Sequence, residues 1–250
     1  MEKELVGVIP AAGKGTRIAD LPFTRVLPKT MLPILNKPII EYIVDNMKNI
    51  GIKTIYIIVN PNNNFIQEYF KDGSDFGVEI KYIEQNNPEG IAHAISLVKD
   101  YVKGPFVVIL GDDFTITDSL GNVVETFLEK DCLVMEGVVE DNDVQSIKRT
   151  CNVILDNGKI VDIIEKPENV NSNIRGCGIY IFDPKVFDYI EKTPKTPPKN
   201  EVEITNTIKL MAKDGLAYGT HINGINININ TTTDLYSVLK LVLEKNKTLL

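Results

Sequence analysis

The sequence predicts an α/β fold in which helices cover both faces of a parallel sheet. Short apolar runs rich in β-branched residues recur along residues 1–110, as in strands that are buried on both faces, and amphipathic stretches separate them. Alternating units of this kind build a parallel sheet. Because ligands bind such sheets at the carboxyl ends of the strands, the loops that follow the strands are the first candidates for a functional site.

The first half of the chain alternates predicted strands with predicted helices. Pro38 suits the first position of a helix, and Gly51 ends that helix. A second helix runs to about Lys71, and a third is predicted at 88–102, where apolar residues recur at helical spacing. The predicted strands are residues 5–9, 54–59, 78–83 and 106–110.

The second half is less regular. Asp156-Asn157-Gly158 lies between two apolar runs and is a strong hairpin signal. A helix is expected to open after Asp183-Pro184, and the stretch 193–200, rich in Pro, Lys and Thr, is expected to be a mobile loop. The other predicted elements are strands at 132–139, 153–155, 160–164, 178–182, 216–222 and 225–229, and helices at 204–213 and 234–247.

Composition excludes several classes of protein. The 250 residues carry a net charge of −7 and no basic stripe, which argues against a nucleic-acid partner and an anionic membrane surface. The three cysteines are scattered and lack CxxC spacing, so neither a disulfide framework nor a zinc site is predicted. The N-terminus does not read as a signal peptide, and no apolar run reaches membrane-spanning length. A cytoplasmic protein is therefore expected.

The loop after the first strand has the character of a phosphate site. Small residues and two glycines in 10–17 let backbone N–H groups approach a ligand, and Arg17 and Lys29 add positive charge. Two familiar phosphate motifs do not fit, because Gly15 follows Lys14 where a P-loop has Ser or Thr, and Ile18 replaces the third Gly of a dinucleotide motif. For these residues alone, an ordinary turn is the simpler alternative.

Two carboxylates follow the predicted strand at 106–110. Asp112 and Asp113 should lie at the same sheet edge as the opening loop. Adjacent carboxylates need a cation nearby, and Mg²⁺ shared with substrate phosphates would satisfy them. A simple Gly-Asp-Asp turn is the alternative.

Four motifs taken together resemble the sugar-1-phosphate nucleotidyltransferases, particularly the glucose-1-phosphate thymidylyl- and uridylyltransferases. The resemblance covers nearly the full chain and implies a single Rossmann-like nucleotide-diphospho-sugar transferase domain with a mixed, mostly parallel sheet. Residues 1–115 would form the nucleotide-binding half, and 116–250 the sugar-phosphate-binding half with the C-terminal helix. In chain order the motifs are 11–17 with Pro28-Lys29, Gln85 to Ala94, Gly111-Asp112, and Glu165-Lys166-Pro167.

The resemblance also implies residue roles. Arg17 and Lys29 would meet the triphosphate of an NTP, and Lys166 the phosphate of the acceptor. The Gln85 carboxamide offers a donor and an acceptor to uracil or thymine, with the Gly90 backbone beside it, whereas His93 is expected to be a satisfied structural histidine. The implied nucleotide-binding residues are Ala11, Ala12, Gly13, Gly15, Thr16, Arg17, Gln85, Gly90 and Asp112, and the implied sugar-phosphate-binding residues are Glu165, Lys166 and Gly178.

The metal and sugar sides depart from the family pattern. Asp112 would bind Mg²⁺, but Asn228 stands where many members carry a second metal aspartate, and Asn230 where they carry Gly. Either asparagine remains a candidate second ligand. Cys151 replaces a usual Gly before the hairpin, so the sugar is the least defined substrate.

The implied reaction joins an NTP, dTTP or UTP, to a sugar 1-phosphate such as glucose 1-phosphate, with release of pyrophosphate and Mg²⁺ as cofactor. The partners would be these small molecules, and a homo-oligomer remains open. Three alternatives are kept: a cytidylyltransferase for another phosphate acceptor, a regulatory protein that only binds nucleotide sugars, and a glycosyltransferase. The last is disfavoured because Asp112-Asp113 lacks the Asp-x-Asp spacing of its metal motif.

Overall fold

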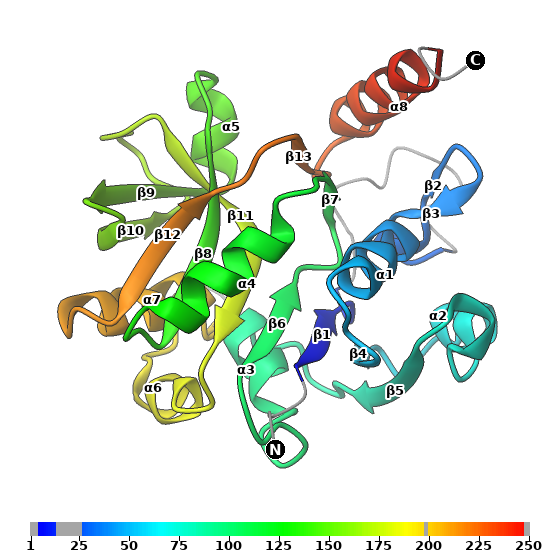
Figure 1. The fold of residues 1–250 in the computed structure, drawn as a ribbon, viewed down its shortest axis with the longest axis horizontal. Coiled ribbons are helices and arrows are strands. Elements are labelled where there is room, and N and C mark those ends of the chain that lie inside the picture. The colour runs from blue at the N-terminus through cyan, green and yellow to red at the C-terminus, as the bar shows by residue number, and fades with distance from the viewer. Residues whose placement is uncertain (1–4, 14–26, 198–199, 248–250) are drawn as a thin grey trace.

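A nine-stranded mixed sheet forms the centre of the computed structural model, which describes residues 5–13, 27–197 and 200–247 (Figure 1). The strand order is β5-β4-β1-β6-β11-β8-β12-β10-β9. Its strands are β1 (Val6–Pro10), β4 (Thr54–Val59), β5 (Glu79–Glu84), β6 (Phe106–Ile109), β8 (Val134–Glu140), β9 (Cys151–Asp156), β10 (Lys159–Glu165), β11 (Ile174–Phe182) and β12 (Ala217–His221).

The predicted α/β fold class is confirmed. The four strands of the first half, β5, β4, β1 and β6, are all parallel, as their β-branched runs predicted. The sheet then continues without a break into the second half, because β11 pairs antiparallel with both β6 and β8. At the hairpin between β9 and β10, Asn157 and Gly158 both have positive φ, as the turn signal predicted.

Helices cover both faces of the sheet. One apolar core lies between the sheet and α3, α6 and α7, and the other lies between the sheet and α1, α2 and α4. Successive strand residues such as Val107 and Val108 belong to opposite cores, which is the alternation that a doubly covered strand requires. The helices are α1 (Ile39–Asn49), α2 (Phe65–Phe70), α3 (Ile91–Ser96), α4 (Leu120–Glu129), α5 (Val144–Arg149), α6 (Val186–Lys192), α7 (Ile204–Lys213) and α8 (Thr232–Lys247).

A third, smaller core brings the C-terminal part of the chain to the first half. Leu235 and Val238 of α8 pack with Leu32, Ile34 and Phe114. A short antiparallel pair, β7 (Asp113–Ile116) with β13 (Ile225–Asn228), lies beside this core, and a second pair joins β2 (Pro33–Ile34) to β3 (Lys37–Pro38). This arrangement holds residues near 29, 112 and 230 against one another.

Five of these helices and strands were not predicted from the sequence, and one helix was predicted too long. β2, β3, β7, α4 and α5 lie in stretches for which no element was expected. The sequence of α4 contains Gly121 and several β-branched residues, which favour helix weakly, and burial of Leu120, Val123 and Phe127 compensates. The helix predicted at 88–102 is regular only over α3. Gly90 has a φ of +104°, and the N–H groups of residues 97–99 and 101 donate to carbonyls three positions back.

Within the residues that the structure describes, no helix combines the length and the apolar character needed to span a membrane.

Candidate functional site

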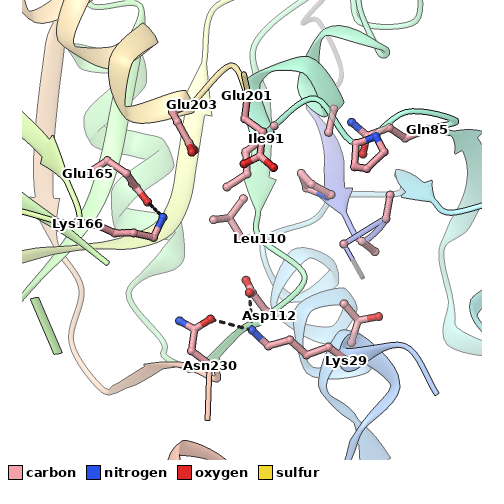
Figure 2. Close-up of a pocket in the computed structure, with 18 residues that line it drawn as sticks. Lys29, Gln85, Ile91, Leu110, Asp112, Glu165, Lys166, Glu201, Glu203 and Asn230 are labelled. Carbon is pink, nitrogen blue, oxygen red and sulfur yellow. Dashed lines mark hydrogen bonds and ion pairs between the residues drawn. The ribbon is translucent and has the colours of Figure 1, made fainter. Parts of the chain in front are cut away.

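The carboxyl ends of the first-half strands border a cavity of about 470 Å³ (Figure 2). Residues from both halves of the chain line it. Gln85 and Lys166 lie on opposite sides of the view, and Asp112 and Lys29 lie between and below them. The cavity brings together ten of the predicted site residues, namely Ala11, Ala12, Gly13, Lys29, Gln85, Gly90, Asp112, Glu165, Lys166 and Asn230.

A smaller hollow of about 110 Å³ adjoins this cavity and shares Asp112, Glu165, Lys166 and Asn230 with it. Two further predicted residues, Gly178 and Asn228, line this hollow instead of the main cavity. The remaining predicted residues, Gly15, Thr16 and Arg17, lie outside the described part of the chain.

The opening loop and Asp112 are held together by a close backbone approach. The N–H of Gly111 donates to the carbonyl of Pro10 at 3.1 Å. A Cβ at position 111 would come within 2.8 Å of that carbonyl oxygen and of the Thr30 Cγ2 atom. Glycine therefore permits the contact that sets Asp112 beside the loop. The buried Ala11 is fixed in turn by its bond to the carbonyl of Ile58 at 2.8 Å.

At the centre of the cavity, a lysine bridges distant parts of the chain. The Lys29 Nζ atom donates to Asp112 Oδ2 at 2.7 Å and to Asn230 Oδ1 at 3.2 Å (Figure 2). Asn228 donates to Asp112 Oδ1 at 3.4 Å, and Asn230 donates to Asn228 Oδ1. One carboxylate oxygen and one amide oxygen thus already face a single cation.

The strand pair β7–β13 fixes these asparagines. In its register Asn228 lies opposite Asp113, and the N–H of Ile229 donates to the Asp112 carbonyl at 3.0 Å. The backbone N–H groups of Asn230 and Thr231 donate to Asp234 Oδ2 in the first turn of α8, at 2.9 and 2.7 Å. The carboxylate therefore ties the end of β13 to the start of the helix.

Asp113 differs from its neighbour by being fully buried. Burial raises the pKa of Asp113 to about 8, and the adjacent charge of Asp112 adds to this effect. The positive charges of Arg175 and Lys29 and a hydrogen bond from Asn228 act in the opposite direction. Gly178 makes room for this carboxyl, since a Cβ there would come within 1.9 Å of Asp113 Oδ2. Gly178, with a φ of +65°, therefore has a structural reason to be glycine, besides lining the hollow.

Gln85 lies at the end of β5 and is 7% exposed. Its Nε2 atom lies 2.9 Å from His93 Nδ1. An amide nitrogen can only donate, so the histidine nitrogen accepts and its proton lies on Nε2. This bond confirms that His93 has a structural partner, and it fixes the orientation of the Gln85 carboxamide.

Gly90 has a structural reason that the sequence did not reveal. Its φ is +104°, and a Cβ would meet the backbone oxygen of Val202 at 2.5 Å. Val202 donates to the carbonyl of Glu89 at 2.7 Å and accepts from Ala92 at 3.1 Å. Backbone hydrogen bonds therefore join the segment before α7 to the start of α3, and they require a glycine at position 90 because a Cβ would clash with Val202.

Replacing Gly90 with alanine is expected to destabilise the fold by about 1–3 kcal/mol, because strained backbone and a clash with a main-chain atom act together. Thermal unfolding measures this. Gly121→Ala is the matched control, since nothing lies within 4 Å of a Cβ there and its helical position favours alanine. A Gly90→Ala variant with the melting temperature of the wild type would show that a side chain at position 90 does not clash with Val202.

The opposite side of the cavity carries Glu165 and Lys166, which form an ion pair at the end of β10. Lys166 has a φ of +44°, and its N–H donates to the carbonyl of Thr150 at 2.7 Å. Glu203, at the start of α7, lies near this pair (Figure 2). Three polar lining residues, Thr30, Glu201 and Glu203, were not among the predicted site residues. The segment Glu203-Ile204-Thr205-Asn206, a further stretch that resembles the family, was a sequence signal for the last.

Cys151, in the wall of the hollow, contacts the buried carboxyl of Glu136, which does not itself line the hollow. Glu136 is fully buried, which raises its pKa to about 8, and it accepts a bond from the Cys151 thiol. Burial, with Glu136 beside it, raises the pKa of Cys151 well above its usual range, so the thiol is neutral. Gly176 lies against both groups, with a hypothetical Cβ 2.1 Å from Glu136 Oε1. The Cys151 side chain thus fits because of a neighbouring glycine.

The chain has relatives among known proteins. The family profile described as "Nucleotidyl transferase" matches residues 6–239. The chain is 35% identical over 86% of its length to the low-salt glycan biosynthesis nucleotidyltransferase Agl11 of Haloferax volcanii, but spans only 59% of that relative. It is 31% identical to a Bacillus subtilis protein provisionally named a UTP–glucose-1-phosphate uridylyltransferase, with 96% of each chain covered.

Among solved structures, a UDP-glucose pyrophosphorylase in complex with UDP-glucose superposes with a TM-score of 0.85 at 25% identity, covering 97% of this chain and 99% of that one. The chain spans little more than half of the first curated relatives that it matches, 59% and 55% of their lengths.

Proposed function

This chain belongs to the nucleotidyl transferase family, and from that premise we propose that it is an NDP-sugar pyrophosphorylase. It joins an NTP, UTP or dTTP, to a sugar 1-phosphate such as glucose 1-phosphate and releases pyrophosphate. The observation that carries the proposal is the single cavity with Lys29 beside the small-residue loop on one side and Lys166 on the other. Two phosphate-binding groups from different halves of the chain suit two phosphorylated substrates.

The reaction needs no covalent intermediate. An oxygen of the sugar phosphate attacks the α-phosphorus of the NTP in line, and pyrophosphate leaves. Arg17, Lys29 and the N–H groups of the loop hold the triphosphate, while Lys166 holds the acceptor phosphate and Glu165 its sugar hydroxyls. Rate enhancement comes from positioning two anions and neutralising their charge.

Magnesium fits this site as an ion that the protein and the substrate phosphates would bind together. Among the described residues, no three His, Cys, Asp or Glu side chains gather to hold a metal by themselves. Mg²⁺ commonly uses one or two protein oxygens and completes its shell with substrate phosphates and water. Asp112 and Asn230 are the favoured pair, because their oxygens already converge on one ammonium group, whereas Asn228 Oδ1 is engaged by Asn230. The ion would neutralise phosphate charge.

Base selection falls to the Gln85 end of the cavity. The bond from Gln85 to His93 fixes the carboxamide and leaves its oxygen for the N–H of uracil or thymine. The Gly90 backbone lines the same cavity and would lie against the base. A structurally similar pyrophosphorylase has been solved with UDP-glucose bound, which supports a uridine nucleotide as a candidate substrate.

A panel of five NTPs against several sugar 1-phosphates tests the proposal, with pyrophosphate release and Mg²⁺ dependence as the readouts. UTP or dTTP with a hexose 1-phosphate is expected to give the fastest release. Turnover restricted to CTP would favour the cytidylyltransferase alternative. Tight nucleotide binding without any pyrophosphate release would favour a regulatory module that binds nucleotide sugars and has lost catalysis.

A further inference from the structure

Thr205 carries a buried hydroxyl without a hydrogen bond. It lies in the first turn of α7, is 2% exposed, and its Oγ1 atom has no partner among the residues that the structure describes. The same residue lines the smaller hollow, together with Glu165, Lys166 and Tyr180. Buried polar atoms are nearly always paired, so an unpaired one on a cavity wall points to a ligand.

The next threonine on the same helix shows the ordinary arrangement. Thr207 is fully buried, and its hydroxyl bonds to Thr193 Oγ1 at 2.9 Å. Thr193 also donates to the carbonyl of Tyr189 at 2.8 Å. The hydroxyl of Thr207 is therefore satisfied within the protein, whereas the buried hydroxyl of Thr205, a residue that lines the hollow, is not.

The chemistry of the hollow selects the kind of group that could meet Thr205. The carboxyls of Asp112, Asp113 and Glu165 line it beside the cationic side chains of Arg149 and Lys166, and its volume of about 110 Å³ is too small for a nucleoside. A hydroxyl both donates and accepts, so it pairs well with another hydroxyl. Lys166 at the border with the main cavity would hold the phosphate of the same molecule.

We propose that Thr205 is a specificity-determining residue that hydrogen-bonds one ring hydroxyl of the sugar moiety. This inference rests on the proposed function and assigns the sugar ring of the acceptor to this hollow. Without that sugar hydroxyl the threonine stays unpaired, so an acceptor that lacks it is discriminated against. Discrimination of this kind exceeds what an apolar contact of the same size provides.

Thr205→Val tests the proposal, because valine keeps the shape and removes the hydroxyl. The affinity for UDP-glucose and for glucose 1-phosphate, measured by calorimetry, is expected to fall about 10-fold or more, the effect of one lost bond to a buried polar group. The affinity for UTP should stay within about twofold, and the melting temperature should stay or rise, since an unpaired polar atom is removed. Unchanged affinity for both sugar ligands overturns the proposal.

Thr207→Val is the matched control on the same helix. It breaks the bond to Thr193, so the melting temperature should fall, while the affinity for UDP-glucose should stay. A series of monodeoxy glucose 1-phosphates identifies the hydroxyl: one analogue should lose affinity for the wild type and lose none further in Thr205→Val. Additive losses for every analogue would contradict the contact.

Failure of the inference differs from failure of the proposed function. If the wild type turns over sugar phosphates and Thr205→Val behaves identically, only the role of Thr205 is wrong. If the wild type binds neither glucose 1-phosphate nor UDP-glucose and turns over no sugar phosphate, the proposed function is wrong and this role is wrong with it.

Discussion

Lys166→Ala is expected to lower kcat/KM for the sugar 1-phosphate by about 10²- to 10³-fold, the usual cost of removing one charged or hydrogen-bonding group that holds a reacting anion. Its ammonium group lies on the side of the cavity away from Gln85, paired with Glu165 (Figure 2). The affinity for UTP should therefore change little. Steady-state kinetics with each substrate varied, together with UTP calorimetry, separates the two effects.

Lys209→Ala is the control for this variant. Lys209 also pairs with a carboxylate of β10, Asp162 at 2.7 Å, but lines neither the main cavity nor the adjoining hollow. It should leave both kinetic constants near those of the wild type. Equal loss of UTP affinity and acceptor turnover in Lys166→Ala would overturn the assignment of Lys166 to the acceptor.

Asp112→Asn is expected to reduce pyrophosphate release by about 10³-fold or more, because it removes the carboxylate proposed to hold Mg²⁺ and to balance Lys29. The amide has the same shape, so the fold should persist. Binding of Mn²⁺ in the presence of UTP, followed by electron paramagnetic resonance, should weaken in parallel with activity.

Asp113→Asn separates this effect from a general loss of negative charge. Asp113 is buried against Gly178 and does not line the main cavity. Its substitution should therefore leave Mn²⁺ binding much closer to that of the wild type than Asp112→Asn does. Equal weakening by the two variants would show that the metal is not held by Asp112 in particular.

Local sequence patterns predicted the elements on which the cavity is built. The run 54–59 matches β4, and 204–213 matches α7, because β-branched residues and helical apolar spacing act over short distances. The Asn157-Gly158 turn was predictable for the same reason. The motifs around Lys29, Gln85, Asp112 and Lys166 were visible as short segments, and their convergence on one cavity agrees with the strand order.

Long-range pairings could not be predicted from local patterns. The register that sets Asn228 opposite Asp113 joins strands more than a hundred positions apart, and the convergence of Asn230 and Asp112 on Lys29 follows from it. The reason for Gly90 lies in Val202, which is equally remote in sequence. The hydroxyl of Thr205 is unpaired because no hydrogen-bonding group of the described residues lies within reach, and the spacing of residues in the sequence does not reveal this.

One cavity is proposed to transfer a nucleotidyl group between two phosphorylated substrates. The most direct test incubates the protein with UTP, glucose 1-phosphate and Mg²⁺ and measures pyrophosphate and NDP-sugar in the same sample. We expect one pyrophosphate for each UDP-glucose, and neither product when either substrate is left out. Pyrophosphate released without glucose 1-phosphate, or substrates bound with no product formed from any NTP and sugar 1-phosphate, would contradict the claim.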